Sequence, residues 1–262
     1  YGYAALSDAE SGFANLKTTL DIIDSFPEFR DLKIHITEFN TSNNPKCPLH
    51  DTNQNAAYIA GQLSRLGDVN ESYSYWTFGD IFEEQGVPFT PFHGGFWLVA
   101  NGCIPKPTFW VFQFYKQLCG ECILKTEDLV VLRTKDGGYQ GIAWNSARTR
   151  AGRELEFVLD FPADAEKEYF FLMKTVDEDT CNPLRLWHDM GEPKSLSAEQ
   201  TKLLQDCARP LVTSARYKEA EGKVSVSFPV SEYGVVYFEL KPAAMEGDRG
   251  YDYTRVTEKG QL

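Results

Sequence analysis

The chain has 262 residues, a formal net charge of −12, and 42% hydrophobic and 14% aromatic residues. This length suits one large domain or two medium ones, and the apolar content is sufficient for a substantial core. An acidic surface repels phosphate groups, so we expect neither nucleic acid nor an anionic membrane as a partner. No apolar run approaches the roughly 18 residues that a membrane span needs.

The chain start and the cysteines indicate where the protein works. Tyr1-Gly-Tyr3 lacks a Met, a basic region and an apolar region, so we expect no signal peptide here and expect a chain entered partway. Six scattered cysteines in a chain of this size favour a reduced, cytoplasmic protein. Cys119-Gly-Glu-Cys122 has no second pair, which indicates a structural role. Three histidines show no metal-ligand spacing, so we expect no metal: His35, His50 and His188.

Helices and strands alternate in the first part of the chain. Apolar residues at helical spacing predict a helix that ends near Ser25, before Pro27. A strand follows over residues 33–39, then a helix that ends near Gly67. Further elements are expected in chain order: a strand over 72–78, an irregular stretch over 79–105 and a helix over 107–118. This alternation is typical of a parallel α/β barrel, of which it supplies about two of the eight strands.

The pattern changes after Gly120. Asp136-Gly-Gly138 separates two apolar runs and predicts a hairpin. Ser197 and Gln200 form a capping box at the start of a helix that reaches about Cys207. Four more short strands are expected, at 155–161, 169–175, 224–229 and 235–240. We therefore predict a C-terminal barrel portion over 1–120 and an accessory β-sandwich domain, with a short helix and a C-terminal tail, over 121–262.

Glu38 is the first candidate for chemistry. It ends an apolar strand face formed with Ile34 and Ile36, which is an unusual place for a charge. Active sites of α/β barrels lie at the C-terminal ends of the strands. A retaining glycoside hydrolase needs a carboxylate nucleophile there, together with a second carboxyl group as acid and base. The alternative is that Glu38 caps a helix or forms a salt bridge at the start of a loop.

Four further residues suit a sugar-binding site. The indole of Trp76 can form the floor of such a site, and Glu83 and Glu84 can bind sugar hydroxyls through charge-assisted hydrogen bonds. His93 lies in a segment that suits a glycine-hinged lid, Phe92-His-Gly-Gly-Phe96. Each has a plainer alternative: core packing for Trp76, a solvated surface for the two glutamates, and a tight turn demanded by the glycines.

Three stretches together resemble glycoside hydrolase family 39, in particular its bacterial β-xylosidases. They are His35-Ile-Thr-Glu-Phe-Asn-Thr-Ser42, Tyr75-Trp-Thr-Phe-Gly-Asp-Ile-Phe-Glu-Glu84, and Phe92 to Phe96 with Ile104-Pro-Lys-Pro-Thr-Phe109. The resemblance implies that Glu38 is the nucleophile and that Trp76, Glu83 and Glu84 bind the terminal xylose of a xylo-oligosaccharide. It also implies the last two strands and helices of a (β/α)8 TIM barrel, then a β-sandwich, with no cofactor.

The chain departs from the family pattern in several places. Asn43 stands where the family usually has tyrosine, and Trp97 where it usually has glycine. The resemblance begins after the sixth barrel strand, and the Asn-Glu-Pro setting of the family's acid/base glutamate does not occur. Glu192-Pro193 lies in the sandwich region and is rejected as its replacement. We therefore expect the chain to be inactive or nearly so alone. It is then half of a split enzyme with a complementing N-terminal half, a self-associating chain, or a truncated product.

Two other functions remain open. α-L-Iduronidase belongs to the same family, but its acidic substrate should prefer basic contacts, whereas the expected pocket loop offers Glu83 and Glu84. A non-catalytic carbohydrate-binding or assembly module would require a line of exposed aromatic side chains on the sandwich. Trp144 and Trp187 are the candidates for that line, and we expect both to lie in the core.

Overall fold

The structure is a computed structural model that describes residues 9–79, 86, 90–146, 153–165 and 167–243. No helix in these described ranges is long and apolar enough to cross a membrane. In chain order the elements are α1 (Ala9–Asp24), η1 (Pro27–Phe29), β1 (His35–Phe39), η2 (Pro48–Asp51), α2 (Asn53–Leu63), β2 (Ser72–Tyr75), β3 (Val99–Ala100), β4 (Ile104–Pro105), α3 (Pro107–Gln117), β5 (Glu121–Lys125), β6 (Leu129–Arg133), β7 (Tyr139–Trp144), β8 (Leu155–Pro162), β9 (Glu168–Val176), α4 (Pro183–Asp189), α5 (Ala198–Cys207), β10 (Leu211–Lys218), β11 (Lys223–Val230) and β12 (Val235–Pro242).

The first part of the chain builds one pair of parallel strands. β1 and β2 pair from His35 opposite Ser72 to Phe39 opposite Tyr75, with a shift of register between Ile36 and Phe39. Among the described residues they form a sheet of two strands, so the barrel is not closed. β2 ends three residues earlier than the predicted strand, and the Trp76–Thr77 peptide bond that follows is cis. Because the two strands run in the same direction, their carboxyl ends lie side by side.

The second part of the chain is antiparallel. Six strands form one sheet in the order β10-β9-β12-β7-β6-β5, and β11 pairs with β8 in a second sheet. β11 alternates strictly between buried and exposed residues, as expected for a strand with one face on the core. Its buried residues pack with those of β7, β9 and β12 in one cluster, which includes Val226, Phe228, Phe171 and Phe238. The two sheets therefore pack face to face.

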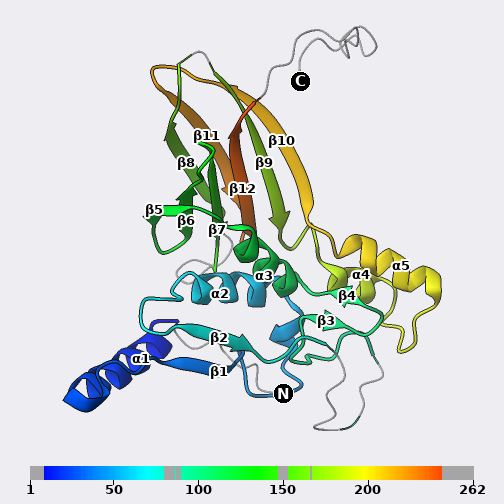
Figure 1. The fold of residues 1–262 in the computed structure, drawn as a ribbon. Helices are drawn as coiled ribbons and strands as arrows, with labels where there is room; N and C mark the ends of the chain where they lie inside the picture. The colour runs from blue at the N-terminus through cyan, green and yellow to red at the C-terminus, as the bar shows by residue number, and fades with distance from the viewer. Residues whose placement is uncertain (1–8, 80–85, 87–89, 147–152, 166, 244–262) are drawn as a thin grey trace, which may run out of the picture.

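α2 and α3 lie between the parallel pair and the antiparallel sheet (Figure 1). The predicted buried stripe of α2 is confirmed, since Ala56, Ile59, Ala60 and Leu63 are all buried. These residues share a cluster with side chains of α3, β7 and β12, and Phe114 stacks on Tyr237. Side chains from both sides of residue 120 thus form one core, and the division into two domains at that point stays a prediction.

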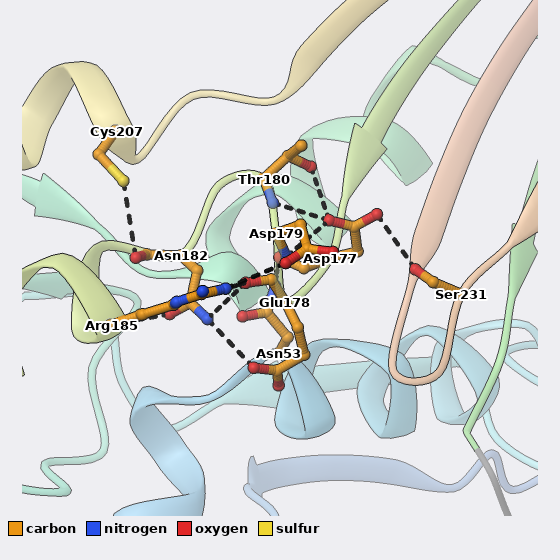
Figure 2. A network of polar contacts seen from close by, with 9 residues as sticks. All are labelled: Asn53, Asp177, Glu178, Asp179, Thr180, Asn182, Arg185, Cys207 and Ser231. Atoms are coloured by element: carbon orange, nitrogen blue, oxygen red, sulfur yellow. Dashed lines mark hydrogen bonds and ion pairs between the residues drawn. The ribbon is translucent and has the colours of Figure 1, made fainter. Parts of the chain in front are cut away.

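A polar network joins the loop after β9 to four other segments (Figure 2). The Asn53 side chain, at the start of α2, donates to the Asp177 carbonyl over 2.8 Å. The Asp177 carboxylate accepts hydrogen bonds from Thr180 and from Ser231, which lies between β11 and β12. Asn182 caps α4, and the Cys207 thiol at the end of α5 contacts its carbonyl. The loop therefore fixes α2 relative to the antiparallel sheet.

Several elements were absent from the sequence prediction. β5, β10 and α4 were not expected, and the stretch predicted as irregular contains β3 paired with β4. The hairpin β6–β7, the strands β8, β9, β11 and β12, and the capping box of α5 are confirmed. The predicted C-terminal tail lies mostly outside the described residues.

Candidate active site

Glu38 lies near the carboxyl end of β1, where its side chain is exposed. It lines an open pocket of about 480 Å³. The other lining residues come from the end of β1, from the loop that follows it and from two later segments: Phe39, Asn40, Ser42, Asn43, Trp76 and Phe96. Parallel pairing places the ends of β1 and β2 together, and so it brings Glu38 and Trp76 to the same pocket although 37 intervening residues separate them.

Asn40 holds the pocket together. Its Nδ2 donates to the carbonyl of Trp76 and, over 3.1 Å, to the carbonyl of Phe96. Its Oδ1 accepts from the backbone N–H of Thr41 over 2.7 Å. One side chain thus joins all three segments that line the pocket. The sequence reasoning missed Asn40, because both carbonyl groups belong to residues distant in sequence.

A second layer of polar side chains lies behind Asn40. Thr41 Oγ1 donates to Asn55 Oδ1, and Asn55 Nδ2 donates to Thr108 Oγ1 over 2.8 Å. Asn55 Nδ2 also lies 3.4 Å from the hydroxyl of Tyr75, whose pKa is raised by burial. These contacts fix the loop after β1 against the starts of α2 and α3, so the backbone that follows Glu38 is anchored.

The segment from Phe92 to Phe96 is packed closely. Gly94 has a φ of +75°, and a Cβ there would lie 2.6 Å from the Cys47 backbone. His50 Nδ1 donates to the Gly94 carbonyl over 2.8 Å, and burial lowers the pKa of His50, which favours its neutral form. This geometry fits the tight turn that was the alternative to a glycine-hinged lid.

The other predicted site residues, His93, Glu83 and Glu84, are not among the described residues that line the pocket. His93 is half-buried, with Nδ1 3.0 Å from the Thr90 carbonyl, and it is not among the residues that line the pocket. Burial lowers the pKa of His93. Glu83 and Glu84 lie outside the described residues. Their binding roles and that of His93 stay predictions.

Asn43 and Trp97, the two residues that differ from the family pattern, both lie among the described residues. Asn43 lines the pocket. Trp97 is 3% exposed, packs against Gly95 and is not among the residues that line the pocket. It therefore does not narrow this pocket.

Glu38 is the single carboxylate among the described residues that line the pocket. The described residues also contain no group of three His, Cys, Asp or Glu side chains that could hold a metal ion. The site therefore offers one exposed carboxylate and one indole at the carboxyl ends of parallel strands. A carboxylate at this position is one of the two carboxyl groups that a glycoside hydrolase built on an α/β barrel uses.

The chain belongs to the family described as "Glycosyl hydrolases family 39", whose sequence model matches residues 5–225. A β-xylosidase of Geobacillus stearothermophilus is 37% identical over 92% of this chain and 47% of its own length. A β-xylosidase of Caldicellulosiruptor saccharolyticus is 35% identical over 66% of this chain and 37% of its own length.

The crystal structure of the family-39 enzyme from Xanthomonas axonopodis pv. citri superimposes with a TM-score of 0.80 at 24% identity. The match covers 92% of this chain and 50% of that structure. The chain is thus β-xylosidase-like and spans about half the length, or less, of the curated relatives that it matches.

Proposed function

We propose that this chain carries the nucleophile of a retaining β-xylosidase, which removes terminal β-linked xylose from xylo-oligosaccharides. The observation that supports this function best is the common pocket of Glu38 and Trp76 at the ends of two paired parallel strands. The substrate class rests on the two relatives named β-xylosidase. In this proposal Glu83, Glu84 and His93 add contacts to the terminal sugar.

The finer fold assignment is part of the proposal. β1 and β2 correspond to the last two strands of a (β/α)8 barrel, and α2 and α3 to the helices that follow them. The two antiparallel layers correspond to an accessory β-sandwich. The superposition on half of a complete family-39 structure supports this assignment.

The reaction is a double displacement. A Glu38 oxygen forms a bond to the anomeric carbon while the bond to the leaving oxygen breaks, which gives a covalent glycosyl-enzyme. A second carboxyl group gives its proton to the leaving oxygen and then removes one from the water that releases xylose. General acid assistance of this kind contributes about 10²–10⁴-fold. Glu38 is the one carboxylate among the described lining residues, and in this proposal the second group comes from the part of the family enzymes that the chain does not match.

We therefore infer that the 262 residues alone have little or no activity. Complementation tests this directly. The portion of the Geobacillus stearothermophilus relative that the chain does not match would be co-expressed with the chain, and hydrolysis of nitrophenyl β-xyloside would be measured. We expect turnover by the complex and close to none by either part.

The matched variants are Glu38→Gln and Glu71→Gln. Glu71 lies just before β2, at the opposite end of the strand pair, in an exposed ion pair with Lys33. We expect Glu38→Gln to lower kcat on the order of 10³-fold or more, as loss of a nucleophile does, and Glu71→Gln to have little effect. Equal activity of the two variant complexes would refute the role of Glu38.

A non-catalytic carbohydrate-binding module is less well supported. Trp144 and Trp187 are both buried, as expected, so neither contributes to an exposed aromatic surface.

A further inference from the structure

A buried ion pair lies behind the candidate site. Asp51, at the end of η2, is 3% exposed, and Lys106, at the N-cap of α3, is 1% exposed. Lys106 Nζ lies 2.5 Å from Asp51 Oδ1 and 5.9 Å from the centre of the Trp97 ring. Neither residue lines the pocket.

Both partners bind the backbone of the same turn. Asp51 Oδ2 accepts a hydrogen bond from Gly94 N over 2.6 Å, and Lys106 Nζ donates to the Gly95 carbonyl over 2.8 Å. The pair therefore holds the N–H of one residue and the C=O of the next. These two glycines directly precede Phe96.

Phe96 connects this turn to the pocket. It lines the pocket, and its carbonyl accepts from Asn40 Nδ2 over 3.1 Å and from Thr77 N over 3.3 Å. Asn40 follows Glu38 by two residues and also binds the Trp76 carbonyl. A continuous set of contacts thus runs from the ion pair to both candidate site residues.

Stability alone does not account for a buried pair of this kind, because apolar replacements of buried ion pairs are often neutral or stabilising. We propose that Asp51 and Lys106 are positioning residues that hold Phe96 and Asn40, and through them Glu38 and Trp76, in the arrangement that the reaction needs. This inference rests on the proposed function. Small displacements of reacting groups cost up to about 10²-fold in rate.

Three variants separate charge from geometry. Asp51→Asn and Lys106→Gln each leave one buried charge without its partner. The double variant Asp51→Asn/Lys106→Gln is neutral, and its amides can still accept from Gly94 N and donate to the Gly95 carbonyl. Asp68→Asn is the control, because it breaks an exposed ion pair with Lys125, 2.8 Å long, at the other end of α2.

The measurement is kcat and KM of the complemented enzyme, expressed per folded site. We expect each single variant to lower kcat/KM about 10–100-fold, mainly through kcat, and the double variant to recover at least tenfold of that loss. We expect Asp68→Asn to match the unaltered enzyme. Single variants that fold and keep full kcat would overturn the proposal. It would also be overturned if loss of folded protein alone accounted for the whole loss of activity.

Hydrogen exchange of the 262-residue chain tests the same contacts without activity. Asp51→Asn should speed exchange of the Trp76, Thr77 and Leu98 amides by about tenfold or more relative to Asp68→Asn. Unchanged exchange at these amides would overturn the positioning role. A complex without turnover that depends on Glu38 would refute the proposed function. If Asp51→Asn still speeds exchange in that case, the contact network itself remains supported.

Discussion

The Trp97 indole occupies the space that a side chain at residue 95 would need. A Cβ at residue 95 would overlap the Cε2 and Cζ2 atoms of the Trp97 indole, which itself packs against His93 and lies near Lys106. The indole is nearly fully buried, so it has little space to move. The large residue at position 97 therefore makes glycine necessary at position 95.

Gly95→Ala should consequently destabilise the chain by about 1–3 kcal/mol, the usual cost of excess volume in a packed core. Gly12→Ala is the control, because Gly12 is an exposed residue of α1 with nothing within 4 Å of its ideal Cβ. That change should stabilise by about 0.5–1 kcal/mol. Denaturant unfolding measures both, and equal midpoints for the two variants would contradict the packing argument.

At the residue scale the sequence predicts which side chains are candidates for the site, but not which groups they form hydrogen bonds with. Glu38 and Trp76 were chosen as candidates because each lies near the C-terminal end of a predicted strand, and the pairing of β1 with β2 brings both to one pocket. Asn40, Asp51 and Lys106 were missed because their hydrogen bonds cross 11 to 56 residues of sequence, and no local pattern records such contacts. The burial of Lys106 was the hardest feature to predict. Lysine is rarely buried unless it is paired, and its partner Asp51 is distant in sequence.

At the element scale, the start of α2 is attached to two parts of the molecule. Asp51, just before the helix, binds the turn behind the pocket, and Asn53, within its first turn, binds the loop after β9. Thr52 caps the helix between them by accepting from Asn55 N. This short segment therefore relates the candidate site to the antiparallel sheet.

Asn53→Ala should weaken this attachment. Asn53 is fully buried, and its loss leaves the Asp177 carbonyl without that donor, at a cost of about 1–3 kcal/mol. Ser231→Ala is the control in the same network, because Asp177 keeps its hydrogen bonds from Thr180 when Ser231 is removed. We expect a smaller cost for it in urea unfolding. A larger loss from Ser231→Ala would contradict this account of the network.

Predicting elements from sequence succeeded where a pattern was long and regular. α2 shows its apolar stripe, and the hairpin β6–β7 has a strong turn signal in Asp136-Gly-Gly138. β10 was missed because it is an edge strand with one intermediate and seven exposed residues, so it lacks the alternation of a half-buried strand. α4 has seven residues, too few for a helical period to be recognised.

At the scale of the whole molecule, apolar side chains are exposed around the parallel strand pair. They belong to α1, η1 and the segments that flank β1 and β2: Ile22, Phe26, Phe29, Leu32 and Phe78. Exposed apolar groups of this size often mark surfaces that another part of a protein covers. Together with the open sheet of two strands, they support the proposal that further barrel strands complete the site.

The most direct test of the role of Glu38 is capture of its covalent intermediate. A dinitrophenyl xyloside with fluorine beside the anomeric carbon keeps a good leaving group, while the fluorine slows release of the intermediate. Incubation with the complemented enzyme should add one fluoro-xylosyl group to the peptide that contains Glu38, as read by mass spectrometry, and Glu38→Gln should abolish this addition. A group attached to a different carboxylate, or no addition in a complex that hydrolyses the nitrophenyl substrate, would contradict the assignment of Glu38 as the nucleophile.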